Sequence, residues 1–275
     1  MSAELLAETP ADLPDIGPRR AASAVGFVRS ATRGFAFAFA LAISALDYGR
    51  LALLSRGSDP RQRRARWLHR WCRVYACLIG LRLSSRGSVP RSGMIVSNHL
   101  SYLDIVALSA LTPCVFVAKK EVASWPVFGI FARLAGTVFV DRSRRMDVAA
   151  TNAAIEEALK SGAVVVLFAE GTSSGGQTVL PFRSSLLGSA AASRGAVVPA
   201  AIHYQIADGS VPDEVCYWGD MTLLPHLINL LGKRQIQTQI AFGSPGSVAS
   251  PRSRKEAAVQ LRDEVAALHG ELAVS

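Results

Sequence analysis

From about residue 92 onward, short apolar runs alternate with longer stretches that have helical periodicity. Short apolar runs between turn residues are typical of buried strands, and apolar residues three and four apart mark one face of a helix. Strands that alternate with helices favour an α/β fold, with a largely parallel sheet flanked by helices. The runs are Met94–Val96, Val115–Ala118, Thr137–Val140, Ala163–Phe168, Val197–Ile202 and Ile236–Phe242, and the helical stretches are Tyr102–Leu111, Pro126–Leu134, Met146–Lys160, Ser184–Arg194 and Arg254–Leu268.

Two more helical segments lie before this domain, and the first is apolar. The uncharged stretch Gly34–Leu46 is 13 residues long, which corresponds to a helix of about 20 Å at about 1.5 Å per residue. A membrane-spanning helix needs about 20 apolar residues. We therefore expect Gly34–Leu54 to enter one leaflet of a membrane rather than to cross it.

The second segment, Arg61–Leu83, predicts a helix with a tryptophan-bearing apolar stripe. The stripe residues recur at spacings of four and three, and arginines occupy the adjoining face. Aromatic rings beside cations suit a helix that lies in a membrane interface. The alternative is a helix packed on the core of the domain, with its arginines in water. The stripe contains Trp67, Trp71, Val74, Leu78 and Leu81, and the arginines are Arg66, Arg70 and Arg73.

The positive charge of the chain is concentrated beside these helices. The chain carries 30 basic and 21 acidic side chains, and Arg50–Arg73 holds eight arginines and one acid, Asp59. One dense basic block beside apolar sequence suits an anionic membrane surface. A nucleic-acid binder usually spreads its basic groups over the binding surface, so we expect a membrane as partner and no nucleic acid.

The cysteines and the first residues bear on the compartment. The four cysteines form neither a C-x-x-C pair nor a zinc spacing, so we expect reduced thiols, no metal site and an intracellular protein. The first 18 residues hold four acids and no base before Arg19, unlike a secretory signal. We expect a disordered tail (1–20), a two-helix membrane-associating module (21–84) and an α/β domain (85–275), on the cytoplasmic face of the inner membrane.

Reactive side chains follow two of the predicted strands, and the carboxyl ends of strands are where such sheets collect them. After Met94–Val96 come His99 and Asp104, which would point about 140° apart in one regular helix at about 100° per residue. They can meet only if His99 precedes the helix and Asp104 lies in its first turn. Ser101-x-x-Asp104 resembles a capping box, which places the start of the helix between the two residues, as this requires. An aspartate that accepts from one imidazole nitrogen makes the other a better base. The alternative is a capping aspartate beside a buried histidine.

The second of these two strands, Ala163–Phe168, is followed by the glycine-rich sequence Ala169–Gly176. The backbone N–H groups of such a turn can bind an anion. It contains Gly171-Thr172-Ser173-Ser174-Gly175, a literal match to the G-x-S-x-G nucleophile elbow of α/β-hydrolases. That elbow needs a helix directly after it, and Gly176–Pro181 is not typical of one. A serine hydrolase that uses Ser173 stays an alternative.

Together these blocks resemble the glycerolipid acyltransferase family, which includes the 1-acylglycerol-3-phosphate O-acyltransferases. His99-x4-Asp104 matches the family's H-x4-D motif, and Phe168–Thr172 is similar to its F-P-E-G-T motif. Gly136–Arg142 and Val198–Ile202 resemble the second and fourth motifs, in the family's order. The resemblance extends over roughly Arg91–His203.

The resemblance implies that His99 is a general base oriented by Asp104, and that Glu170, Gly171 and Thr172 bind substrate. It implies no cofactor and no metal, since the acyl group arrives on a thioester.

This sequence departs from the family pattern at two positions. Ala169 replaces the proline of the F-P-E-G-T motif, and Ser173 replaces the arginine that usually follows the threonine and binds phosphate. We expect another cation to take its place. The candidates are Lys119, Arg142 and Arg183.

The resemblance implies an O-acyltransferase that moves a fatty acyl group from acyl-CoA or acyl carrier protein to the hydroxyl of a lysolipid. The first expectation for the acceptor is 1-acylglycerol-3-phosphate, which would give phosphatidic acid. A lyso-ornithine lipid is the alternative acceptor, because a zwitterionic head group makes less use of the missing cation. A non-catalytic lipid-binding protein with the same fold is the alternative of another class.

Overall fold

The structure is a computed structural model that describes residues 24–54, 59–140, 147–187, 197–246 and 253–274. The predicted tail 1–20, the candidate cation Arg142 and most of the predicted helix Ser184–Arg194 lie outside these residues.

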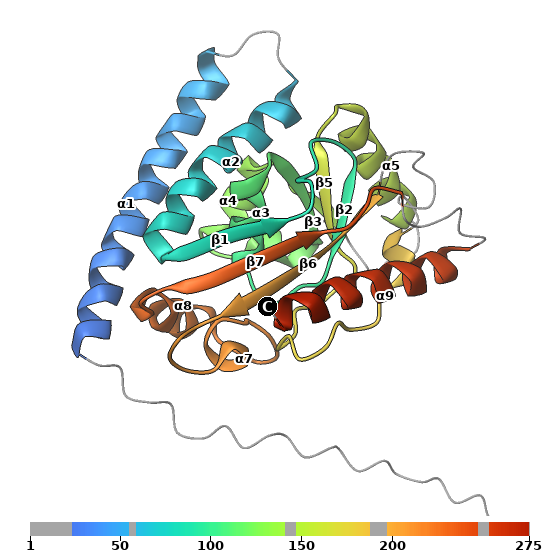
Figure 1. Cartoon of the computed structure of the whole chain (residues 1–275). Helices are drawn as coiled ribbons and strands as arrows, with labels where there is room; N and C mark the ends of the chain where they lie inside the picture. Colours follow the sequence, from blue (N-terminus) through green and yellow to red (C-terminus); the bar gives the residue numbers. More distant parts are fainter. Residues whose placement is uncertain (1–23, 55–58, 141–146, 188–196, 247–252, 275) are drawn as a thin grey trace, which may run out of the picture.

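A seven-stranded sheet forms the centre of the molecule, with the strand order β1-β7-β6-β2-β5-β3-β4 (Figure 1). Neighbouring strands run parallel except β6 and β7, which are antiparallel. The predicted α/β fold with a largely parallel sheet is therefore confirmed. The strands are β1 (Leu81–Arg86), β2 (Met94–Ser97), β3 (Cys114–Lys119), β4 (Val138–Val140), β5 (Val164–Phe168), β6 (Val197–Gln205) and β7 (Ile236–Phe242).

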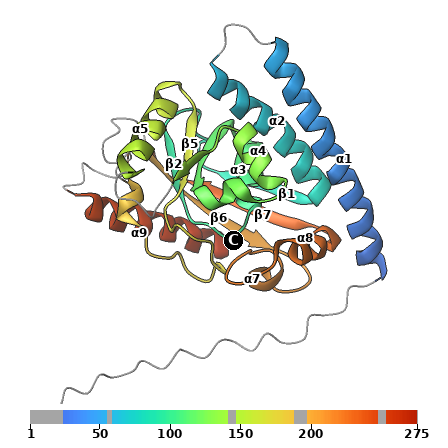
Figure 2. The ribbon, with the colours of Figure 1, turned by 180° about the vertical axis from the view of Figure 1, so that it is seen from behind.

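Helices cover both faces of the sheet, as the front and back views show (Figures 1 and 2). Because successive residues of a strand point to opposite faces, Ile95 of β2 packs with residues of α1, α2, α3 and α8, whereas Met94 and Val96 pack with α5 and α9. The helices are α1 (Ala24–Leu54), α2 (Pro60–Ile79), α3 (Leu103–Leu111), α4 (Phe128–Leu134), α5 (Asp147–Lys160), α7 (Val211–Glu214), α8 (Leu223–Gly232) and α9 (Arg254–Ala273), with 3-10 turns η1 (Lys120–Ser124) and η2 (Ser184–Leu187).

Helix α2 ends four residues earlier than the sequence predicts. Gly80 adopts φ +88° in the left-handed region, and its N–H bonds to the carbonyls of Ala76 and Cys77. This is a glycine C-cap, and a Cβ at Gly80 would lie 2.7 Å from the guanidinium of Arg33. Leu81 therefore begins strand β1, which pairs with β7, and the prediction of a helix through Leu83 was wrong.

The tryptophan stripe of α2 faces the protein rather than a membrane. Trp67 is only 2% exposed, its ring centroid lies 5.2 Å from that of Tyr48 on α1, and its indole N–H donates to the carbonyl of Ser44. The structure shows the alternative, a helix packed on the core, for Trp67, Trp71 and Leu78, whereas Val74 of the same stripe is 40% exposed. Arg66 and Arg73 are exposed.

Helix α1 is 31 residues long, and its length and composition alone would let it cross a membrane. One of its faces is fixed to the domain. Arg33 donates to carbonyls at the ends of α2 and α8, namely those of Ile79, Leu231, Lys233 and Arg234. Ser30 donates to the carbonyl of Ile228, and Arg29 to that of Gly232.

The opposite face of α1 is apolar and open to solvent, which supports part of the predicted two-helix module. Phe35 is 78% exposed and Phe39 is 61% exposed. Because Arg29, Ser30 and Arg33 fix one face of α1 to the domain, the apolar face is left uncovered by the described residues. The other exposed large side chains of this helix are Val25, Phe27, Val28, Ile43, Leu46, Leu53 and Leu54.

Candidate active site

The histidine and aspartate singled out by sequence meet at the carboxyl end of β2. His99 lies in the loop after β2, and Asp104 lies in the first turn of α3. Nδ1 of His99 is 2.7 Å from Oδ2 of Asp104. Because a carboxylate only accepts, Nδ1 carries the hydrogen, and the neutral ring then presents the lone pair of Nε2. The His99 side chain is 23% exposed, whereas that of Asp104 is fully buried.

Asp104 is held by hydrogen bonds to both of its carboxylate oxygens. Oδ2 also accepts the backbone N–H groups of Leu100 at 2.7 Å and Ser101 at 3.1 Å. Oδ1 accepts the hydroxyl of Tyr204 on β6 at 2.6 Å. The bond from the Ser101 N–H is the acidic half of a capping box. The hydroxyl of Ser101 caps no amide among the described residues, so only that half of the predicted motif forms.

The plane of the His99 ring is set by an aromatic neighbour. Phe168, the last residue of β5, stacks on the imidazole with ring centroids 4.1 Å apart and planes 13° apart. Phe116 of β3 stacks in turn on Phe168 at 6.0 Å. The stack therefore holds the imidazole in a fixed plane beside the end of β5.

The glycine-rich loop after β5 lies against the histidine loop. The N–H of Ser174 donates to the carbonyl of His99 at 3.0 Å. Gly171 sits at φ +73° and closes a turn by donating to the carbonyl of Phe168. Thr172, next in the chain, is exposed. The structure therefore brings the two predicted motifs together at one edge of the sheet.

Glu170 is buried beside the pair. Burial is the largest effect on its carboxyl and raises the pKa to about 8. The nearby Asp104 carboxylate also raises this pKa, whereas the backbone N–H groups of Leu180 and His99 lower it. At neutral pH the carboxyl is therefore largely protonated and can donate a hydrogen bond.

Of the cation candidates that the structure describes, Arg183 contacts this loop directly. Its backbone N–H donates to the carbonyl of Ala169 at 2.8 Å, and its Nε donates to the carbonyl of Glu170 at 3.2 Å. Lys119 is exposed at the end of β3, and β5 stands between β3 and β2 in the sheet. Arg142 lies outside the described residues.

The nucleophile-elbow alternative lacks its structural context. Residues 171–183 contain no helix, and the next helical turn is η2. The downstream histidines contact other groups: His226 bonds to the Tyr102 hydroxyl and the Cys216 carbonyl, both at 2.9 Å, and His269 packs against His203. Ser173 therefore lacks the strand–turn–helix setting that exposes such a nucleophile.

Sequence reasoning missed two side chains that organise this site. Asn98 bonds to the backbone of Ile202 on β6 in both directions, through its Nδ2 at 3.0 Å and its Oδ1 at 2.8 Å. Tyr204 lies two residues further along β6 and reaches Asp104. The sequence does show Asn98 directly before His99 and Tyr204 within an apolar strand. Their contacts could not be predicted from it, because they depend on β6 lying beside β2 in the sheet.

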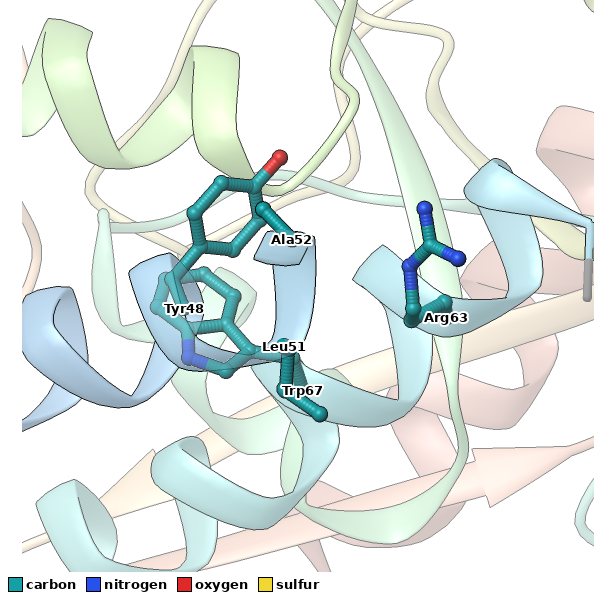
Figure 3. Close-up of a pocket in the computed structure, with 5 residues that line it drawn as sticks. All are labelled: Tyr48, Leu51, Ala52, Arg63 and Trp67. Carbon is teal, nitrogen blue, oxygen red and sulfur yellow. The ribbon is translucent and has the colours of Figure 1, made fainter. Parts of the chain in front are cut away.

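Two pockets differ in what they can hold. A pocket between α1 and α2, bordered by Tyr48, Arg63 and Trp67 (Figure 3), encloses about 10 Å³, on the order of one water molecule. A larger pocket of about 370 Å³ is lined by Leu100, next to His99, and by Tyr204. The second volume is in the range of small-molecule sites.

Comparison with known proteins agrees with this geometry. A family model described as Acyltransferase matches residues 82–203. A lyso-ornithine lipid O-acyltransferase of Brucella abortus is 40% identical over 210 residues, covering 71% of this chain and 79% of that protein. A 1-acyl-sn-glycerol-3-phosphate acyltransferase of Neisseria gonorrhoeae is 33% identical over 165 residues, covering 60% of this chain and 64% of that protein. The crystal structure of the 1-acyl-sn-glycerophosphate acyltransferase PlsC from Thermotoga maritima shares the fold, with a TM-score of 0.64 and 20% identity, covering 91% of this chain and 97% of that one.

Proposed function

The chain belongs to the acyltransferase family, and we propose that it transfers a fatty acyl group from an acyl thioester to the free hydroxyl of a lysolipid. The observation that carries the proposal is the contact of 2.7 Å between Nδ1 of His99 and Oδ2 of Asp104. This contact leaves Nε2 as the base in a partly exposed site.

The reaction needs one proton acceptor and no covalent enzyme intermediate. Nε2 of His99 takes the proton of the lysolipid hydroxyl as its oxygen attacks the thioester carbonyl. Asp104 stabilises the imidazolium that forms. The tetrahedral intermediate then expels a thiolate, which needs little acid assistance because thiol pKa values lie near 8.5. The proton on His99 returns to the thiolate or to water.

The glycine-rich loop supplies the remaining groups. The amide of Gly171 already closes its turn, so the neighbouring amide of Thr172 is the donor we assign to the developing oxyanion. Protonated Glu170 donates to the acceptor head group, and Arg183 supplies the cation beside it. Lys119 is a second cation at the same edge.

The acceptor that fits the family's phosphate chemistry is 1-acylglycerol-3-phosphate, with phosphatidic acid as product. A lyso-ornithine lipid is the second candidate, and two observations favour it. Ser173 stands where the family pattern has an arginine, and relatives named as lyso-ornithine lipid O-acyltransferases match up to 71% of this chain. Either acyl-CoA or acyl carrier protein can serve as the donor.

The enzyme would work at a membrane surface. The exposed face of α1 and the basic block Arg50–Arg73 support docking to anionic lipids. We propose that this surface is the cytoplasmic leaflet of the inner membrane, where acyl thioesters are available.

The test is an assay of the purified full-length protein in detergent micelles with radiolabelled acyl thioesters. Lysophosphatidic acid and lyso-ornithine lipid are offered in parallel, and His99→Ala and Ser173→Ala are compared with the wild type. Esterification that is lost in His99→Ala and kept in Ser173→Ala supports the proposal. Turnover that survives His99→Ala would refute the mechanism, and loss only in Ser173→Ala would favour a serine hydrolase.

A further inference from the structure

We propose that Tyr204 is a positioning residue for the His99–Asp104 pair: its hydroxyl occupies Oδ1 of Asp104 and thereby directs Oδ2 towards Nδ1 of His99. This inference rests on the proposed roles of His99 and Asp104.

Burial makes the Tyr204 hydroxyl hard to replace. Tyr204 is 1% exposed and Asp104 is 0% exposed, so bulk water does not reach the 2.6 Å bond between them. A buried acceptor that loses its donor retains the full cost of desolvation. Without the hydroxyl, Oδ1 would have no donor, and the carboxylate could recover a hydrogen bond by rotating Oδ1 toward the amides of Leu100 and Ser101. Oδ2 would then leave the ring of His99.

The strand that carries Tyr204 is locked to the histidine loop. β2 and β6 pair in parallel from Met94 with Val197 to Ser97 with Ala200. Asn98 then extends this ladder with its side-chain amide, which bonds to both backbone groups of Ile202. Ile202 and Tyr204 share one face of β6 because strand residues alternate. Asn98, the residue before the proposed base, therefore fixes the strand register that places Tyr204 against Asp104.

The hydroxyl remains a donor over the working pH range. Burial, followed by the nearby Asp104 carboxylate, raises the pKa of Tyr204 well above its ordinary value. It therefore cannot act as a base at neutral pH, and its contribution is the hydrogen bond. Removing this donor should let the carboxylate turn away from Nδ1, so the imidazolium of His99 would lose part of its stabilisation.

The experiment compares Tyr204→Phe with Tyr75→Phe in the full-length enzyme in detergent micelles. Tyr75 is the matched control because it is also a buried tyrosine, 5% exposed, whose hydroxyl donates to Ser44 Oγ at 2.5 Å, away from the site. Tyr204→Phe should lower kcat about 10-fold, as expected for a lost bond to a charged group. The KM values of both substrates should stay unchanged, and the acidic limb of the pH–rate profile should move to lower pH, because an imidazolium that has lost its carboxylate contact is less stable. Tyr75→Phe should leave kcat and the profile unchanged.

Asp104→Asn separates this inference from the function it rests on. If Asp104→Asn keeps wild-type turnover, the proposed mechanism itself fails. If Asp104→Asn loses activity while Tyr204→Phe matches the wild type in kcat and pH profile, only the role of Tyr204 fails. A loss of kcat in Tyr204→Phe that follows lost thermal stability, with an unmoved acidic limb, would show a merely structural tyrosine and overturn the inference.

Discussion

The imidazole of His99 lies flat on the ring of Phe168, with planes 13° apart and centroids separated by 4.1 Å. This stack joins the two motifs through their side chains, just as the bond from the Ser174 amide to the His99 carbonyl joins them through the backbone.

Replacing Phe168 with leucine should lower kcat about 10-fold, because His99, the proposed base, would lose the neighbour that fixes the plane of its ring. The measurement is steady-state turnover in micelles. Phe242→Leu on β7 is the control, since Phe242 is also buried at 5% exposure and lies on a strand that pairs with neither β2 nor β5. Equal kcat values for the two variants would contradict the role of the stack.

Glu170→Gln should change how stability depends on pH. In the folded enzyme burial raises the pKa of Glu170 to about 8 from an ordinary 4.5, so between these values the folded state holds a proton that the unfolded chain has released. The wild type therefore loses stability as pH rises through this window. The neutral glutamine variant avoids this loss, and its stability relative to the wild type should increase from pH 5 to pH 8.

Denaturant unfolding in micelles at several pH values checks this expectation. Glu271→Gln, at an exposed position on α9, is the control and should show the wild-type dependence. A constant difference between Glu170→Gln and the wild type across this range would show that Glu170 is charged in the folded protein.

Arg33→Ala should loosen α1 from the domain. The substitution removes donors to four backbone carbonyls. We expect the free energy of unfolding to fall by roughly 2 kcal/mol, because hydrogen bonds to charged groups contribute about 1.5 to 3 kcal/mol each when buried and this site is partly exposed. Amide hydrogen exchange in α1 should accelerate. Arg73→Ala, at an exposed position on α2, should leave that exchange unchanged, and unaltered exchange in Arg33→Ala would argue against the anchor.

The double substitution Phe35→Ser and Phe39→Ser should weaken membrane binding about 10-fold or more, because two large apolar side chains would no longer enter the lipid. Co-sedimentation with vesicles containing anionic lipid measures this, and turnover in detergent micelles should be retained. Val259→Ser on α9, 60% exposed on the other face of the sheet, is the control. Wild-type binding by the double variant would place the docking surface elsewhere.

The layered fold could be predicted from the sequence because its strands are short apolar runs between turns. Six of the strands have apolar runs that were visible in this way, and β7 matches its predicted bounds of Ile236–Phe242. β1 was missed because Leu78 and Leu81 continue the helical spacing of α2, and only the conformation of Gly80 separates them. The Trp67 stripe was misplaced because amphipathicity alone does not distinguish a protein core from a lipid interface.

The His99–Asp104 contact could be predicted because it is local, with five residues between a strand end and a helix start. The contact of Asp104 with Tyr204 spans 100 positions and depends on the order of strands in the sheet. No spacing rule links those two residues, so only the folded structure shows them together. Arg183 entered as one of three candidate cations, and its bond to the Glu170 carbonyl now distinguishes it.

The carbonyls that hold Arg33 belong to Ile79 and, about 150 positions later in the chain, to Leu231, Lys233 and Arg234. During synthesis, α1 emerges from the ribosome long before the second group of its partners exists. Until then α1 can pack against α2, but the face that α8 later covers stays open. Only when α8 has been made can Arg29, Ser30 and Arg33 all reach their carbonyl partners, so α1 is fixed to the domain only late in synthesis.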